Sequence, residues 1–360
     1  MARIDLKGIA HAYRSNPHQP SDYALQALDL VWEDGGAYAL LGPSGSGKST
    51  LLNILSGLVI PTNGQLLFDG VDVTRLPTRQ RNIAQVFQFP VIYDTMSVFD
   101  NLAFPLRNRK LDTKTVNARV AQVAEILELT PDLAKRASGL TADAKQRISM
   151  GRGLVRQDVA AILFDEPLTV IDPHLKWILR RKIKQIHHEL KLTLIYVTHD
   201  QTEALTFADK VVVMDNGAVL QQGSPQDLFE EPSHAFVGHF IGSPGMNLIP
   251  CQLAGEAISV DGQTVPLAGG VAARAGTGAL TMGIRPEFVA LDDPGGAVPL
   301  ALLVAEVEQL GGHQLVTAML AGKRFQIKTS PLRPVMAGQK LTAFLPAARL
   351  KLYADNLLVT

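Results

Sequence analysis

The chain has 360 residues, of which 46% are hydrophobic, so it is long enough for two or three domains that each bury a core. Its 34 lysine and arginine residues balance its 34 aspartate and glutamate residues, which excludes a global basic field for nucleic acid or anionic lipid unless a local patch exists. The single cysteine, Cys251, excludes an internal disulfide framework and a thiolate zinc site, as is typical of a reducing compartment.

The sequence carries no signal for membrane insertion. No apolar run approaches the roughly 18 residues that a membrane-spanning helix requires, and residues 1–5 lack the apolar core of a signal peptide. We therefore expect a cytoplasmic chain that reaches a membrane only through partner subunits.

Residues 3–9 and 25–31 have the pattern of two short strands joined by the polar loop 14–21, which predicts an antiparallel pair. Tyr13 follows the first strand. An aromatic side chain at this point can stack on adenine, and an ordinary surface tyrosine fits the local sequence nearly as well.

The stretch 42–50 carries the strongest signal. It matches G-x-x-x-x-G-K-S/T, follows an apolar run over 37–41 and opens into a helical pattern over 51–56. Such a loop turns backbone N–H groups toward phosphates, and the helix that follows adds its positive end. Lys48 is predicted to reach the β and γ oxygens, and Ser49 to offer its hydroxyl to Mg²⁺. The predicted phosphate-binding residues are Gly42, Pro43, Ser44, Gly45, Ser46, Gly47, Lys48, Ser49 and Thr50.

Two further strands are predicted after this loop, over 64–70 and over 83–88, and the second ends in Gln88. From residue 98 to about 156 the apolar spacing is helical, with a break at Pro131, which indicates an inserted helical unit.

The run 159–164 is continuously apolar, as expected of a strand buried on both faces of a parallel sheet, and it ends in Asp165 and Glu166. An amphipathic helix is predicted over 173–191, with Asp172 as its cap. The expected elements that follow are a strand over 192–197 that ends just before His199, a helix over 201–208, a strand over 210–214 and a turn at 216–217.

Polar side chains stand at successive strand ends in this pattern, where doubly wound sheets bind ligands. Asp165 is predicted to hold Mg²⁺ directly or through water, and Glu166 to polarise the attacking water. Gln88 and His199 are predicted to contact Mg²⁺, water or the γ-phosphate. A strand-end Asp-Glu pair is usually only a solvated turn, and a lone His or Gln is usually structural. Their combination with the phosphate loop favours the functional interpretation.

Residues 246–360 differ in composition from the preceding segment and are rich in Gly, Ala, Val and Leu. Short strands are expected over 257–260, 279–284, 301–307, 325–329 and 341–345. Their regular spacing predicts a small barrel or sandwich, and no catalytic constellation stands out in it.

Taken together, several segments resemble an ABC-transporter ATPase subunit. They are the phosphate loop, Gln88, the segment 162–167, Asp172 and the segment 198–205. The segments 236–247 and 283–287 are similar to the maltose and glycerol-3-phosphate importer branch. The resemblance covers nearly the whole chain.

This resemblance implies an α/β P-loop nucleotide-binding domain over 1–240, with a helical subdomain over about 90–156, and a C-terminal all-β, OB-like regulatory domain over 246–360. It implies that Tyr13 stacks on adenine, Glu166 is the catalytic base, His199 is the switch histidine and Gln88 links the γ-phosphate to the transmembrane subunits. The implied cofactors are ATP and Mg²⁺, with Ser49, Gln88 and Asp165 at the metal. Asp172 is counted with the nucleotide-binding residues.

One motif departs from the family. Where the family has Leu-Ser-Gly-Gly-Gln, this chain has Leu-Thr-Ala-Asp-Ala over 140–144. The family element contacts the γ-phosphate bound on the opposite subunit, so Thr141, Ala142 and Asp143 are expected there. Ala142 adds a Cβ where close approach needs glycine, and Asp143 adds negative charge. A carboxylate about 5 Å from a phosphate charge costs on the order of 3 kcal/mol, whereas the same carboxylate turned outward contributes roughly 0.3–1 kcal/mol to its helix.

The resemblance implies an importer ATPase that is attached to permeases on the inner face of the cell membrane and served indirectly by a periplasmic binding protein. From the altered motif we expect this ATPase to pair with a second, different ATPase subunit. The altered motif and the loop 87–96 look most like the paired ATPases of bacterial glycerol importers. A homodimeric ATPase for a sugar or glycerol-3-phosphate is the alternative. A soluble non-transport ATPase of the same fold and a mainly regulatory nucleotide-binding module are alternatives of another class.

Overall fold

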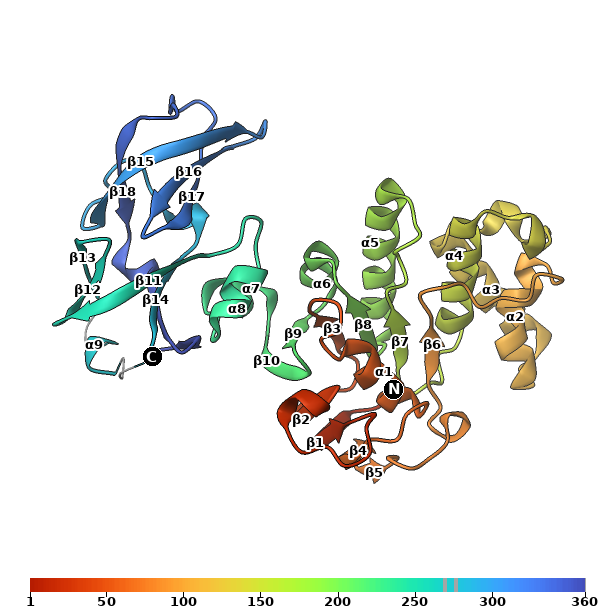
Figure 1. Cartoon of the computed structure of the whole chain (residues 1–360). Helices are drawn as coiled ribbons and strands as arrows, with labels where there is room; N and C mark the ends of the chain where they lie inside the picture. Colours follow the sequence, from red (N-terminus) through yellow and green to blue (C-terminus); the bar gives the residue numbers. More distant parts are fainter. Residues whose placement is uncertain (268–270, 275–277, 360) are drawn as a thin grey trace. The chain divides into compact units, whose positions relative to one another are not determined.

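The computed structural model describes residues 1–267, 271–274 and 278–359, and the chain forms two compact units, Met1–Pro225 and Gln226–Thr360 (Figure 1). Within these described ranges, no helix combines the length and apolar character needed to cross a bilayer.

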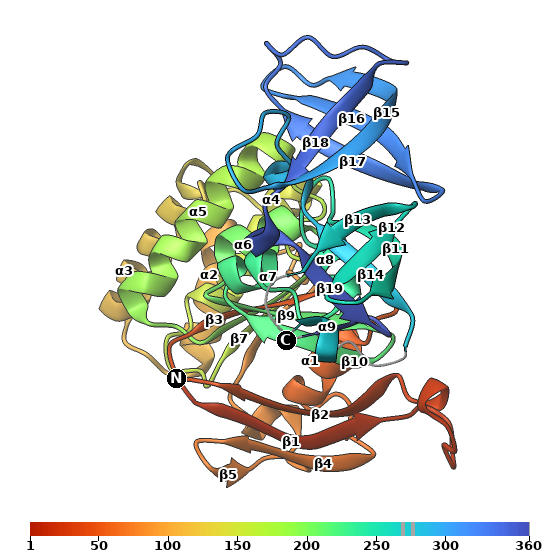
Figure 2. The same cartoon turned by 90° about the vertical axis from the view of Figure 1, so that its left-hand side faces the viewer.

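The first unit contains a small antiparallel sheet whose strands run side by side as a layer of their own (Figure 2). Its order is β2 (Leu25–Trp32), β1 (Ile4–His11), β4 (Asn63–Phe68) and β5 (Val71–Asp72). The predicted antiparallel pair is confirmed, since Ile4 lies opposite Trp32 and His11 opposite Leu25.

A larger sheet forms the centre of the first unit. Its order is β10 (Ala218–Gly223), β9 (Lys210–Asp215), β3 (Ala37–Leu41), β8 (Leu194–Thr198), β7 (Ile162–Asp165) and β6 (Ala84–Val86). All neighbours pair in parallel except β10, which runs antiparallel to β9. The parallel strands bring the carboxyl ends of β3, β6, β7 and β8 to one edge, as the sequence predicted.

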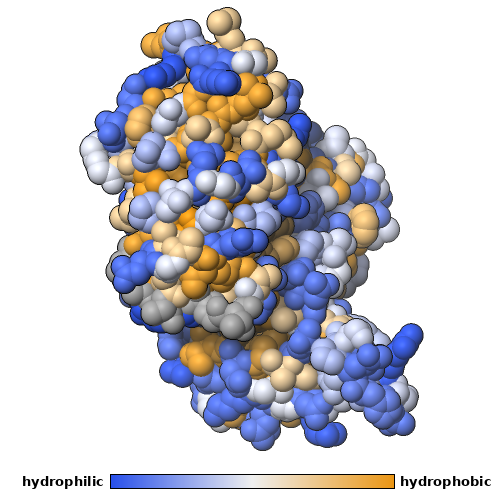
Figure 3. All heavy atoms as spheres, turned by 60° about the vertical axis from the view of Figure 1, so that its left-hand side comes forward, coloured by the Kyte–Doolittle hydropathy of each residue, from blue (hydrophilic) through white to orange (hydrophobic). Residues whose placement is uncertain are grey.

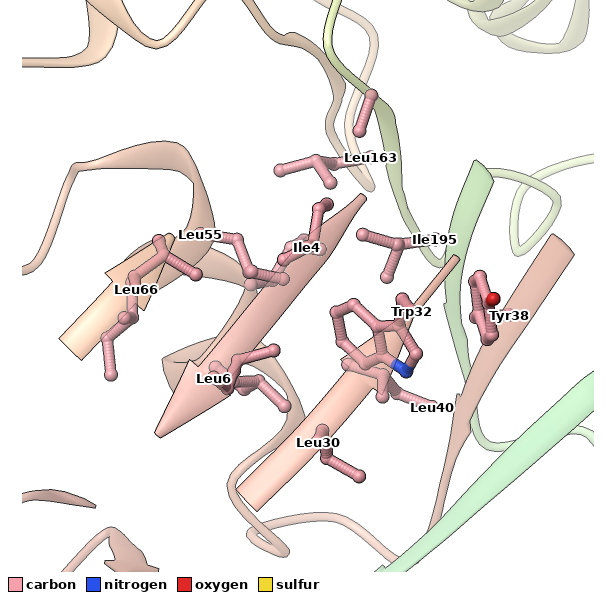
Figure 4. Packing of buried hydrophobic residues seen from close by; sticks show 14 of the residues in the cluster. Ile4, Leu6, Leu30, Trp32, Tyr38, Leu40, Leu55, Leu66, Leu163 and Ile195 are labelled. Carbon is pink, nitrogen blue, oxygen red and sulfur yellow. The ribbon is translucent and has the colours of Figure 1, made fainter. Parts of the chain in front are cut away.

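One hydrophobic core joins the two sheets of this unit. Figure 4 shows Ile4, Leu6, Leu30 and Trp32 from the small sheet facing Leu40, Leu163 and Ile195 from the large one. Trp32 and Ile195 are fully buried. Each such side chain contributes about 1.5–3 kcal/mol by leaving water, so the phosphate loop that follows β3 is anchored on a rigid base.

Helices begin at the capping residues that the sequence supplies. The helices of the first unit are α1 (Lys48–Ser56), α2 (Val98–Asn108), α3 (Thr113–Ile126), α4 (Ala142–Leu154), α5 (Pro173–Leu190) and α6 (Gln201–Phe207). The side chains of Ser97, Asp112 and Thr141 accept backbone N–H groups at the starts of α2, α3 and α4. These three helices pack on one another as the predicted helical unit (Figure 1).

The second unit is dominated by two antiparallel sheets. One has the order β13 (Gln263–Pro266), β12 (Ala257–Val260), β11 (Asn247–Ala254), β14 (Leu280–Ile284), β19 (Lys351–Ala354) and β20 (Leu357–Leu358). The other has the order β17 (Lys323–Thr329), β16 (Gln314–Leu320), β15 (Val298–Gln309) and β18 (Lys340–Leu345). They share a core that includes Ile249, Val316 and Phe325. On the face that Figure 3 presents, apolar and hydrophilic residues are interspersed.

Short helices accompany these sheets, namely α7 (Pro225–Glu230), α8 (Ala235–Phe240) and α9 (Val271–Arg274). Arg285 fastens α7 and α8 to the sheets. Its buried guanidinium donates to the carbonyls of Phe229, Gly238 and Ile241 and lies 3.9 Å from the centre of the Phe229 ring, and burial lowers its pKa to about 10. The compact units consequently divide at Pro225, ahead of the 240–246 boundary that the sequence suggested.

Sequence patterns missed several strands, including β11 and β16. β11 contains Pro250, which argues against a central strand. Residues 247–251 of β11 pair with β14, and residues 252–254 pair with β12. Pro250 therefore has a paired strand on one side only. β16 is buried along nearly its whole length and therefore shows no alternation.

Candidate functional site

The phosphate loop lies between β3 and α1. At two of its positions, glycine is required because a side chain would clash with neighbouring backbone. A Cβ at Gly42 would lie 2.2 Å from the carbonyl oxygen of Met214, and one at Gly47 would lie 2.7 Å from that of Ala24. Gly47 also has a φ of 97°, a left-handed conformation that favours glycine, and it caps α1. The loop can therefore approach its neighbours closely.

Lys48 is held inside this loop. Its Nζ donates to the carbonyl oxygens of Gly42 and Pro43, both at 2.8 Å, and lies 3.3 Å from Ser46 Oγ. Burial lowers the pKa of Lys48, while the charges of Glu166 and Asp165 act to raise it. The ammonium is thus a desolvated cation in a fixed place, which suits an anionic phosphate.

A cavity of about 840 Å³ opens over the loop. Its walls are Ala24, Pro43, Ser44, Gly45, Ser46, Gly47, Lys48, Ser49, Thr50, Gln88, Glu166 and His199. Residues from three predicted strand ends, Gln88, Glu166 and His199, therefore meet the phosphate loop in one space. Its volume is in the range of small-molecule sites.

Glu166 and His199 are in direct contact on the wall of this cavity. His199 Nδ1 lies 3.1 Å from Glu166 Oε1. Glu166 has a φ of 45°, a left-handed conformation that is strained for a residue with a side chain. Thr169 holds it there, because its hydroxyl donates to the carbonyl oxygen of Glu166 at 3.1 Å and to Oε2 at 3.3 Å. Sequence reasoning missed Thr169, although a hydroxyl three residues after a candidate base was a readable signal.

Asp165 lies at the end of β7 and does not belong to the described wall of the cavity. Burial raises its pKa, the neighbouring Glu166 raises it further, and Lys48 opposes both. A half-buried carboxylate whose charged form is disfavoured by its surroundings has the chemistry of a cation ligand.

Tyr13 stands beside the end of the loop. Its Oη lies 3.3 Å from Thr50 Oγ1, and 66% of its surface is exposed. Its ring also packs edge-on against His11, with centroids 4.6 Å apart. An aromatic face is therefore available to a flat ligand next to the phosphate loop.

The start of α4 lies outside this cavity wall. Thr141 caps the helix by accepting the Ala144 N–H at 3.3 Å, and Ala142 is its first residue. Asp143 turns its carboxylate to Arg147, whose Nη2 lies 2.9 Å from Oδ2. The charge that the sequence placed here is therefore paired within its own helix. Asp172 likewise caps α5, accepting the His174 N–H at 2.9 Å.

Family models match both units. The model described as "ABC transporter" matches residues 25–169, which include the phosphate loop, Gln88 and Glu166. The model described as "MalK OB fold domain" matches residues 242–289 in the second unit.

Curated relatives align along almost the whole chain. The sn-glycerol-3-phosphate import ATP-binding protein UgpC of Yersinia pestis bv. Antiqua is 38% identical over 360 residues, covering 98% of this chain and 97% of the relative. The protein of the same name from Burkholderia mallei is 38% identical over 361 residues, covering 98% of each.

Solved structures match nearly two thirds of the chain. CbiO1 of Clostridium perfringens, part of the ABC transporter complex cbiONQ, matches with a TM-score of 0.57 and 26% identity, covering 63% of this chain and 90% of that one. The ATP-binding cassette MJ0796, in a dimeric post-hydrolysis state with ADP and Pi, matches with a TM-score of 0.54 and 25% identity, covering 62% and 98%. The predicted fold, a P-loop ABC ATPase followed by an OB-fold domain, is confirmed. The chain belongs to the ABC-transporter ATP-binding proteins of the maltose and glycerol-3-phosphate importer branch, and it is an importer ATPase.

Proposed function

We propose that this ATPase powers the uptake of a small solute built on glycerol, either glycerol-3-phosphate or glycerol itself. The observation that carries the activity is the single cavity wall shared by Lys48, Glu166 and His199. The names of the relatives that align along almost the whole chain support glycerol-3-phosphate, and the altered motif over 140–144 supports glycerol through its likeness to glycerol importers.

In this proposal the phosphate loop and Lys48 bind the polyphosphate of ATP, and Tyr13 stacks on the adenine. Ser49, Gln88 and Asp165 would hold Mg²⁺, and their hydroxyl, amide and carboxylate oxygens are the donors that this ion prefers. When bound, the ion neutralises charge on the phosphates. Glu166 accepts the hydrogen bond of the attacking water, and His199 keeps that carboxylate oriented.

We propose further that two copies of this chain pair with each other. The comparisons do not support a second, different ATPase. The case for one depended on the Cβ of Ala142 and on an uncompensated negative charge at Asp143. Arg147 supplies the compensating charge for Asp143 within the same helix. A phosphate on the opposite copy would then meet a neutral pair. Light scattering of purified Glu166→Gln chain with ATP tests this: a dimer supports the proposal, and a monomer that dimerises only with another ATPase overturns it.

The permease partners are proposed to dock on a groove beside the Gln88 loop, which attaches the chain peripherally to the inner face of the membrane. The groove has a volume of about 420 Å³ and is lined by Phe87, Val91, Phe104 and Arg152 among others. Next to it, Phe89 is 70% exposed. Exposed aromatic and arginine side chains are typical of protein interfaces.

Uptake measurements in cells that lack the gene test the solute. Wild-type chain is expected to restore uptake of labelled glycerol-3-phosphate or glycerol, and Lys48→Ala is expected to fail. Maltose serves as the control solute. Restored maltose uptake alone would overturn the proposed solute class, and equal complementation by Lys48→Ala would overturn the ATPase role.

A further inference from the structure

Gln146 is a buried side chain in the middle of α4 that touches two loops of the nucleotide site. The residue is fully buried. Its Nε2 donates to the carbonyl oxygen of Phe87 at 3.1 Å and to that of Pro167 at 3.0 Å. Phe87 directly precedes Gln88, and Pro167 directly follows Glu166. A single amide therefore fastens the helical unit to both segments.

The chemistry of this contact admits only one orientation of the amide. Both of its hydrogens face carbonyl oxygens, while Gln146 Oε1 is buried and has no hydrogen-bond partner among the described residues. Turning the amide over would place Oε1 against two acceptors. The unpaired buried oxygen carries a free-energy cost. The two donated hydrogen bonds are therefore the interactions that hold Gln146 in this site.

The segment at Pro167 needs such a restraint. Glu166 is in the left-handed region, with φ of 45°, and a strained residue persists only where its surroundings hold it. The Glu166 N–H donates to the carbonyl oxygen of Val197 at 2.9 Å on one side, and Gln146 holds the Pro167 carbonyl on the other. The position of the Glu166 carboxylate is thus set partly from α4.

We propose that Gln146 is a positioning residue that moves the Gln88 loop and the Glu166 segment together with α4, so that a displacement of the helical unit changes both at once. This inference rests on the proposed function, in which the permeases dock in the groove beside the Gln88 loop. Gln146 does not itself line the cavity around Lys48 as the structure describes it. It acts through Gln88 and Glu166.

The test uses the full transporter complex in proteoliposomes with Gln146→Met, which keeps the length of the side chain and removes both donors. Met150→Ala, on the same helix and equally buried, is the control for lost packing. We expect Gln146→Met to bind ATP with a Kd within about threefold of wild type, to lose at least about tenfold in kcat, and to lose the stimulation of hydrolysis by solute. Met150→Ala is expected to keep that stimulation, whatever its thermal stability.

Failure of this inference is separable from failure of the proposed function. Wild-type complex that shows no solute-stimulated hydrolysis would count against the proposed function. Wild-type complex that is stimulated, with Gln146→Met stimulated equally, would overturn the positioning role alone. Should Gln146→Met not fold, Gln146→Asn, which keeps the donors but shortens their reach, is measured instead. Wild-type stimulation in that variant would likewise overturn the role.

Discussion

His199 Nδ1 and Glu166 Oε1 are 3.1 Å apart, and they come from the ends of two neighbouring parallel strands, β8 and β7. The side chain of Glu166 is 20% exposed and that of His199 is 61% exposed, so the pair has a sheltered carboxylate and an accessible imidazole. This arrangement suits a catalytic base, Glu166, whose carboxylate is held in place by His199 while the His199 imidazole remains accessible to a ligand.

Replacing Glu166 with Gln should separate nucleotide binding from hydrolysis. The amide keeps the shape of the side chain but cannot accept a proton, so we expect kcat to fall at least about 100-fold while the Kd for ATP changes less than about threefold. Steady-state ATPase assays and fluorescent-nucleotide titration measure the two. His188→Ala, a change at an exposed histidine of α5, is the control. A variant that hydrolyses ATP at more than half the wild-type rate would remove Glu166 from the role of base.

Thr169→Val should weaken hydrolysis through Glu166. The change removes the hydroxyl that donates to Glu166 Oε2 and to its carbonyl oxygen while keeping the volume of the side chain. We expect a threefold to tenfold drop in kcat, roughly 0.7–1.4 kcal/mol, and an unchanged KM. Thr169→Ser retains the hydroxyl and should restore most of the rate. If the serine and valine variants have equal rates, the hydrogen bond to Glu166 has no part in catalysis.

The parts of the site that were predictable share one property: their chemistry follows from contiguous sequence or from strand order. The phosphate loop is continuous, and Gln88, Glu166 and His199 follow apolar runs whose carboxyl ends must meet at one edge of a parallel sheet. Asp165 is placed by the same rule.

The parts that were missed depend on where side chains turn. Gln146 sits mid-helix, where nothing in the sequence distinguishes a buried amide from an exposed one. The contact of Thr169 depends on the left-handed backbone conformation of Glu166. That conformation could not be predicted, because the position is not a glycine. Asp143 and Arg147 are one helical turn apart, so their pairing was readable, but the choice between Arg147 and solvent is a rotamer choice that tertiary packing decides.

Cys251 should be slow to alkylate in the folded chain. Burial raises the pKa of its thiol from 9.0 to about 11, so at pH 8 its thiolate fraction falls about 100-fold relative to an unfolded chain. The fold stabilises the protonated thiol. This contribution to stability is fully present below the unfolded pKa and is lost as the pH rises through the folded pKa of about 11. Iodoacetamide rates followed by mass spectrometry, with and without urea, should differ by at least about tenfold. Equal rates in both conditions would contradict a half-buried Cys251.

The pairing of Asp143 with Arg147 should decide whether the altered motif tolerates nucleotide on a facing copy. Arg147 also donates from Nη1 to the carbonyl oxygens of Leu127 and Glu128 at 3.0 and 2.9 Å, so its guanidinium is fixed between α3 and α4. Arg147→Met leaves the Asp143 carboxylate unpaired and free to repel a phosphate, and we expect at least a tenfold loss in kcat/KM for ATP. Adding Asp143→Asn removes that charge and should recover part of the loss.

A double-mutant cycle measures this coupling. With Asp143→Asn, Arg147→Met and the double variant, ATPase rates should give an interaction free energy of about 0.5–3 kcal/mol, the range of residues in direct contact. Salt provides an independent check, because raising the ionic strength screens repulsion and should narrow the gap between Arg147→Met and the double variant. Additive effects that do not change with salt would mean that the Asp143 carboxylate never approaches the nucleotide. Arg147 would then act only by holding α4 against α3.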